Sequence, residues 1–160
     1  MRVLAVLWTL CLARFCSARF YTGRLNSGGN TPIYLITPFI LDLAVPNEDL
    51  VDVSARDMGE VVYRRYSPRE GGRIDAIVDS DMAVWSTGAD EECAFVKSYG
   101  DGQHTLLTIC VHDGINGYSF RYFVKNEKWV PVSKKEFAAS LGEMLDKCSS
   151  YEIPKELLGY

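Results

Sequence analysis

The sequence lacks the motifs that usually reveal an enzyme or a metal site. Its 160 residues include five cysteines and two histidines, and none of them is spaced as Cys-x-x-Cys or His-x-x-x-His. It has no Gly-x-Ser-x-Gly elbow and no glycine-rich phosphate loop between a strand and a helix. These absences argue against a zinc site, a serine hydrolase and a nucleotide-binding enzyme. We therefore expect no metal, no cofactor and no catalytic residues.

Clustered positive charge is also scarce. The chain carries 17 Lys and Arg residues against 21 Asp and Glu residues, a net charge of −4. Its adjacent basic pairs are Arg64-Arg65 and Lys134-Lys135. Because nucleic acids attract proteins through clustered Lys and Arg side chains, we expect no nucleic-acid partner.

The first 18 residues have the pattern of a secretory signal peptide. Arg2 precedes an apolar run from Val3 to Ala13, and small residues end the segment at Ala18. The run is too short to cross a bilayer. Cleavage would remove two basic residues and leave a net charge of −6. We expect secretion, no membrane attachment after cleavage, and a flexible polar leader over residues 19–32.

The remainder predicts one domain over residues 33–148. Short β-prone segments alternate with turn residues, which is typical of an antiparallel meander. We expect an α+β fold: a mostly antiparallel meander of seven or eight strands, forming a curved sheet or partly closed barrel, capped by one C-terminal helix. Residues 54–59 are polar and are expected to form a loop. The expected strand segments are 40–43, 60–66, 73–78, 82–86, 93–100, 103–113, 118–124 and 129–132, and residues 50–53 alternate only weakly.

The helix is expected from Ser133 to Cys148. Ser133 and Glu136 have the spacing of a capping box, and Val132 and Phe137 that of a hydrophobic staple. Apolar residues at helical spacing follow, so this face should pack on the sheet. Residues 149–160 would form a short tail.

Asp101-Gly102 predicts a two-residue type I′ hairpin turn between two strands. In that register Cys93 lies directly opposite Cys110, close enough for a disulfide. A secretory context favours oxidation. The alternative is two small, half-buried thiols, and the sequence leaves both interpretations open.

Other candidates for chemistry are weaker. In this register His104 and His112 share a face with Cys93 and Cys110, but they lack zinc-ligand spacing. A cysteine hydrolase would need one of these thiols beside a histidine base, and no local signature supports it. Three further aromatic residues, Trp85, Trp129 and Phe137, are expected in the core, with carbohydrate or peptide binding as the alternative for the two tryptophans.

The order of these parts from Leu41 to Met144 resembles the FAINT domain, a module of Theileria and related piroplasm parasites. The resemblance covers about two-thirds of the chain and depends on order rather than on one motif. The matching segments are ILDL (Ile40 to Leu43), VVYRRYSPREGGRIDAIVDSDMAVW (Val61 to Trp85), DEEC (Asp90 to Cys93), LLTICVHDG (Leu106 to Gly114), YSFRYF (Tyr118 to Phe123) and KWVPVSKKEF (Lys128 to Phe137).

The resemblance implies a secreted parasite protein, often released into the infected host cell, where it contacts host factors. It supplies no catalytic residues. This chain has one copy of the module and lacks the long linkers of many members. We therefore expect a monomeric, non-enzymatic module that binds a host protein, either outside the parasite or in the host cytoplasm. The alternatives are a secreted small-ligand carrier and a cysteine-dependent enzyme with an unfamiliar site.

Overall fold

A computed structural model describes residues 35–146, all of which belong to one compact unit of the chain. The predicted signal peptide (1–18), leader (19–32) and tail (149–160), together with Cys148, lie outside the described residues. The described elements are β1 (Thr37–Asp42), β2 (Val51–Met58), β3 (Val61–Pro68), β4 (Gly72–Asp79), β5 (Met82–Ser86), β6 (Glu91–Gly100), β7 (Thr105–Asp113), β8 (Gly117–Lys125), β9 (Trp129–Val132) and helix α2 (Lys134–Asp146).

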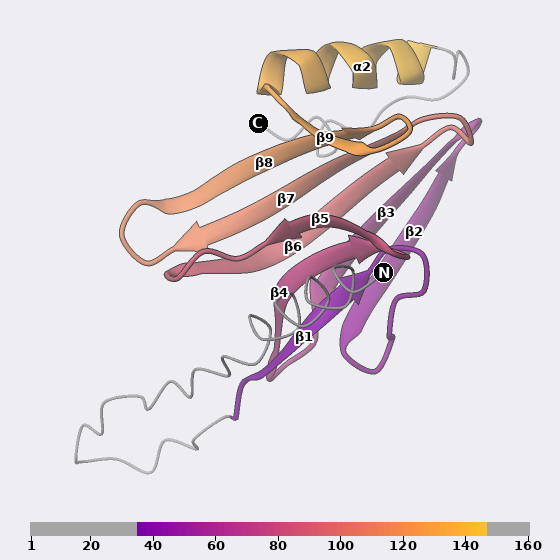
Figure 1. Ribbon diagram of the computed structural model, residues 1–160. Helices are drawn as coiled ribbons and strands as arrows, with labels where there is room; N and C mark the ends of the chain where they lie inside the picture. The colour runs from indigo at the N-terminus through magenta and orange to yellow at the C-terminus, as the bar shows by residue number, and fades with distance from the viewer. Residues whose placement is uncertain (1–34, 147–160) are drawn as a thin grey trace, which may run out of the picture. The chain divides into compact units, whose positions relative to one another are not determined.

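The strands form one open, curved sheet, and α2 lies across one of its faces (Figure 1). The predicted α+β class, with a mostly antiparallel sheet and one C-terminal helix, is confirmed, and the sheet does not close into a barrel. Only β6 to β9 follow the predicted meander order. On its other side β6 pairs with β3 along its C-terminal half and with β4 near its start, so the sheet branches there.

The pairing of β1 with β4 is parallel, which differs from the prediction. A parallel pair needs a crossover connection, because a tight turn cannot return the chain in the same direction. The β2–β3 hairpin supplies it here. The alternation of apolar and polar residues does not show the direction of a strand relative to its neighbour. The parallel pairing of β1 with β4 could therefore not be predicted from the sequence.

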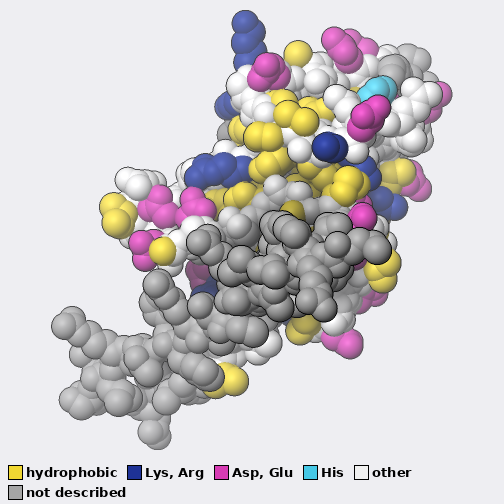
Figure 2. Space-filling model, viewed as in Figure 1, with side chains coloured by type: hydrophobic (Ala, Val, Ile, Leu, Met, Phe, Trp, Pro, Cys, Tyr) yellow, Lys and Arg dark blue, Asp and Glu magenta, His cyan; other side chains and the backbone are white. Residues whose placement is uncertain are grey.

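The two faces of the sheet bury different groups of side chains. We call them the core face and the helix face. The core face holds the larger cluster, which includes Tyr66, Val96, Ile109 and Val111. The helix face buries a second cluster beneath α2. Hydrophobic side chains also gather just below α2 in the space-filling view (Figure 2).

Helix α2 begins as the sequence predicts. The backbone N–H of Ser133 donates to Glu136 Oε2 at 2.8 Å, and the N–H of Glu136 donates to Ser133 Oγ at 3.2 Å. Both hydrogen bonds of the capping box are therefore present. The buried apolar stripe of the helix then packs on the sheet; it consists of Phe137, Leu141, Met144 and Leu145.

The predicted two-residue turn between β6 and β7 is wrong. The connection is a four-residue loop, Asp101 to His104, because Gly100 pairs with Thr105. Gly102 has φ +84°, whereas no positive φ occurs at Asp101, as a type I′ turn would require. The Asp101 carboxylate instead accepts hydrogen bonds from the N–H groups of Gln103 and His104, at 3.0 and 2.7 Å.

Residues 54–58 extend β2 where a loop was predicted. They pair with β3 through Met58, whose side chain is buried on the helix face. The intervening residues are exposed because β2 pairs only with β3 and lies at an edge. An edge strand whose two faces are both solvated has a polar composition, and so does a loop. The sequence could not distinguish the two here.

Candidate binding surface

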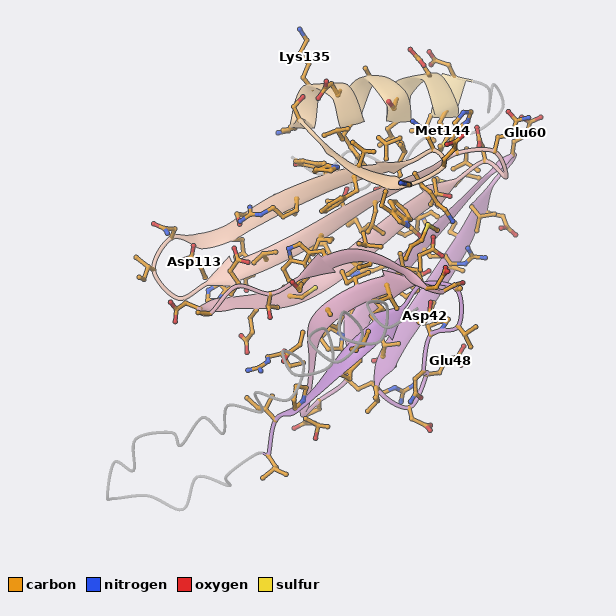
Figure 3. The ribbon with its side chains drawn as sticks, viewed as in Figure 1. Asp42, Glu48, Glu60, Asp113, Lys135 and Met144 are labelled. Atoms are coloured by element: carbon orange, nitrogen blue, oxygen red, sulfur yellow. The ribbon has the colours of Figure 1, made fainter. Side chains whose placement is uncertain are left out.

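Helix α2 covers only part of the helix face. Its first turn contacts Tyr122 through Phe137, with ring centroids 5.0 Å apart. Beyond that contact β6, β7 and β8 continue past the N-terminal end of α2 toward the β7–β8 turn (Figure 1). Figure 3 labels Asp113 at this free end and Met144 on the side of α2 that faces the sheet. Tyr118 is 69% exposed and Phe120 43% exposed, so the free end is open to solvent.

We name this region the aromatic-basic surface. Alternate residues of a strand point to one face, and the register places its members side by side on β3, β6 and β8. It consists of Arg65, Phe95, Lys97, Tyr118, Phe120 and Tyr122.

Its aromatic rings form a connected array. The rings of Phe95 and Phe120 lie 6.5 Å apart across β7, and those of Phe120 and Tyr122 are stacked at 6.4 Å. Tyr118 packs on His112 at 4.8 Å. Contacts at these distances are favourable for aromatic pairs. A partly exposed aromatic array is typical of a surface that contacts another molecule.

Two positive side chains meet over one of these rings. The guanidinium of Arg65 lies 4.3 Å from the centroid of Phe95, and Lys97 Nζ lies 5.4 Å from it. Arg65 and Lys97 are direct partners in the β3–β6 ladder. Burial, followed by the positive charge of Arg65, lowers the pKa of Lys97. The surface therefore combines aromatic area with two adjacent cations.

The two cysteines of the sheet lie on opposite faces. A bulge between Cys93 and Phe95 places Cys93 opposite Val111 and Cys110 opposite Phe95. Cys93 joins the core-face cluster, whereas Cys110 lies beneath the aromatic-basic surface. The predicted register that places Cys93 opposite Cys110 is wrong, and of the two interpretations left open, two free thiols is the one that the structure has.

Neither thiol has the environment of a nucleophile. Burial raises the pKa of Cys93 to about 12. Burial also raises the pKa of Cys110, although Lys97 and Arg65 offset part of this effect. A thiol must ionise to attack, and burial of these two groups disfavours the thiolate form.

The histidines are far apart in the fold. His112 pairs with Tyr118 near the free end, while His104 ends the β6–β7 loop at the other end of β7. Across residues 35–146, no three His, Cys, Asp or Glu side chains are grouped closely enough to hold a metal ion. His104 Nδ1 instead lies 3.6 Å from the Asp101 carboxylate.

A small cavity lies beside that loop, between α2 and β8. It has a volume of about 250 Å³ and is lined in part by Asp101, His104, Glu143 and Met144. Pockets for drug-sized ligands usually measure about 300–1,000 Å³ and are mostly apolar. This cavity is smaller and carries charged groups, so it gives little support to a ligand carrier.

The two tryptophans lie away from the aromatic-basic surface. Both are half-buried and pack against the core-face cluster. Trp129 Nε1 donates to Asp79 Oδ2 at 2.9 Å, and Lys125 pairs with the same carboxylate at 2.6 Å. These contacts link the end of β4 to β8 and β9 across the curved sheet. They give Trp129 a structural role.

Comparisons with protein families, with curated proteins and with solved structures found no match. The resemblance to the FAINT domain therefore stays a prediction. No helix within residues 35–146 is long and apolar enough to span a membrane.

Sequence reasoning missed every member of the aromatic-basic surface as a site residue. The signal was present: the segment YSFRYF alternates aromatic residues at Tyr118, Phe120 and Tyr122, so one face of that strand is aromatic throughout. What the sequence could not show is how α2 lies on the sheet, and hence which part of this face it leaves uncovered.

Proposed function

We propose that the protein is a secreted, non-enzymatic parasite protein whose single FAINT-like module binds a protein of the host cell through the aromatic-basic surface. The observation that carries this proposal is the exposure of Tyr118 and Phe120 on the sheet beside two cations. Aromatic and Arg side chains contribute most of the energy in many protein interfaces. The predicted signal peptide and the order of segments shared with FAINT domains support the location and the kind of partner.

The buried thiols are a second line of support. A cysteine-dependent enzyme would need an ionised thiol near a base, and burial raises the pKa of both Cys93 and Cys110, which disfavours the thiolate. Cys110 instead fills space under the rings of the surface, where its partners in the ladder are Phe95 and Phe120. Its position is that of a small apolar side chain.

Affinity capture from host-cell lysate tests the proposal. If the unmodified protein captures a host protein with saturable binding, the double variant Tyr118→Asp, Phe120→Asp should no longer capture it, because the two aspartates place negative charge on the proposed contact. The matched control is Ile40→Asp, which changes a 55% exposed strand residue outside the surface and should keep the partner. Thermal unfolding of all three proteins establishes that each is folded.

Two outcomes would count against the proposal. If the control and the double variant lost binding of the partner equally, the contact would not depend on the aromatic-basic surface. Absence of any saturable partner, with rapid alkylation of Cys93 or Cys110 at neutral pH, would favour the cysteine-dependent enzyme. Mass spectrometry of the resulting peptides measures the alkylation of each cysteine separately.

A further inference from the structure

Arg65 and Lys97 form an unusual pair, because two positive side chains lie directly opposite each other on neighbouring strands. Like charges in this position repel and destabilise a sheet. Some other cations of the described chain have carboxylate partners: Arg69 pairs with Asp52, and Arg121 pairs with Glu91. Within residues 35–146, neither Arg65 nor Lys97 has such a partner.

Both cations lie over the ring of Phe95, which attracts them but leaves their charge uncompensated. Arg65 Nε also donates a hydrogen bond to Ser67 Oγ at 3.3 Å, which leaves the other guanidinium N–H groups available. Side chains that are already fixed lose less entropy when they bind a ligand. The pair is therefore preorganised for an anion that would relieve the repulsion.

The residues next to the pair are apolar. Phe95 lies two residues from Lys97 on β6, and Phe120 lies two strands away in the same row as Phe95. Residues i and i+2 of an extended peptide are about 6.8 Å apart, which matches the spacing of successive rows on a sheet face. A peptide with a carboxylate over the cations can thus place an apolar side chain over the two phenylalanines.

We propose that the Arg65–Lys97 pair binds a carboxylate of an acidic peptide segment in the partner, while neighbouring apolar side chains of that segment pack on Phe95 and Phe120. This inference rests on the proposed function and names the chemistry of the partner. The net charge of −4 opposes long polyanions such as nucleic acid, whereas two adjacent cations suit one or two carboxylates. The planar guanidinium of Arg65 suits bidentate recognition of a carboxylate.

Nuclear magnetic resonance titration of the isotopically labelled protein tests this inference. The probe is a blocked pentapeptide that alternates glutamate with phenylalanine, and the control peptide alternates lysine with phenylalanine. The acidic peptide should shift the backbone amides of Arg65 and Lys97, and added salt should weaken its binding. The basic peptide should bind more weakly. Inorganic phosphate and single-stranded oligothymidine are titrated separately.

Three single variants locate the contact. Arg65→Gln and Lys97→Gln should each weaken binding of the acidic peptide by roughly tenfold, because each removes a charge-assisted hydrogen bond. Arg64→Gln is the matched control, since Arg64 is an exposed neighbour whose side chain points to the opposite face. It should bind within about twofold of the unmodified protein, as expected for a distant surface charge. The unfolding midpoint should not fall in either test variant.

Several results would overturn the inference. These are no binding of the acidic peptide, equal effects of Arg65→Gln and Arg64→Gln, or tighter binding of phosphate or oligothymidine at the same amides. The inference would also be overturned by a host protein that no longer binds the Tyr118 and Phe120 double variant but still binds Arg65→Gln and Lys97→Gln. That last result would leave the proposed function standing, so the two failures can be distinguished.

Discussion

The two ends of the helix face are built from the same strands but differ in what covers them. At one end Tyr99 is 2% exposed, because Phe137 of α2 packs on it with ring centroids 6.2 Å apart. At the other end Tyr118 is 69% exposed and Phe120 43% exposed. The aromatic side chains of β8 run from Tyr118 at the free end to Tyr122, which lies beneath Phe137. The cover of α2 stops there.

This difference shows that aromatic character alone does not define the core. Burying a large apolar side chain stabilises a fold by about 1.5–3 kcal/mol. The exposed rings at the free end contribute less than that to stability, and their contacts are with each other and with Arg65. The covered end stabilises the fold, and the free end is available for binding.

Removing one ring from each end gives the largest expected contrast. Phe137→Ala should lower the free energy of unfolding by about 3 kcal/mol, because it opens a cavity between α2 and the rings of Tyr99 and Tyr122. Phe120→Ala, the matched change at the free end, should cost about 0.5 kcal/mol. Urea denaturation of both variants measures the two values. Equal costs would mean that the free end is as well packed as the covered end.

The same two ends show how much of the fold was predictable. Capping box, apolar stripe and strand positions follow local rules, so Ser133, Glu136 and Phe137 were assigned correctly to the start of α2. The register of the β6–β7 hairpin was wrong, because the Asp101 side chain stabilises a four-residue loop and a bulge follows Cys93. The bulge places Cys93 on the opposite face from Cys110, so the two thiols cannot form the disulfide that the predicted register allowed.

The candidate surface was less predictable than the fold. Arg65 and Lys97 are 32 positions apart, and Phe95 reaches Phe120 only through the register of three strands. Periodicity shows that such residues share a face with their neighbours along one strand. It does not show which strands are adjacent in the sheet. For example, β3 pairs directly with β6, although β4 and β5 lie between them in the sequence. A surface assembled from non-consecutive strands therefore needs the structure.

A smaller effect should come from the start of α2. Ser133→Ala removes the hydroxyl that accepts the N–H of Glu136 and should lower the free energy of unfolding by about 1 kcal/mol. Ser140→Ala, within the same helix, is the control and should be neutral or slightly stabilising, because alanine favours helix more than serine. Urea denaturation provides the measurement. If Ser133→Ala were harmless, packing alone would hold α2 over the covered end.

The smallest expected effect concerns one carboxylate at each end. Hydrogen bonds from Asn116 and Ile115 hold the pKa of Asp113 below its ordinary value of 3.8 at the free end. Hydrogen bonds from Ser133 hold the pKa of Glu136 below its ordinary value of 4.5 at the start of α2.

A carboxyl group whose pKa is lower in the folded state stabilises the fold when it is ionised. That stabilisation is complete above the ordinary pKa and is lost as the pH falls through the lower, folded value. The free energy of unfolding should therefore decrease below about pH 4.5. Both Glu136→Gln and Asp113→Asn should make that decrease shallower, and the effect of Glu136→Gln should begin at the higher pH, since the ordinary pKa of Glu136 exceeds that of Asp113. Urea denaturation at a series of pH values measures both curves. A curve for Asp113→Asn identical to that of the unmodified protein would show that the turn at the free end adds nothing to global stability, which would sharpen the contrast between the two ends.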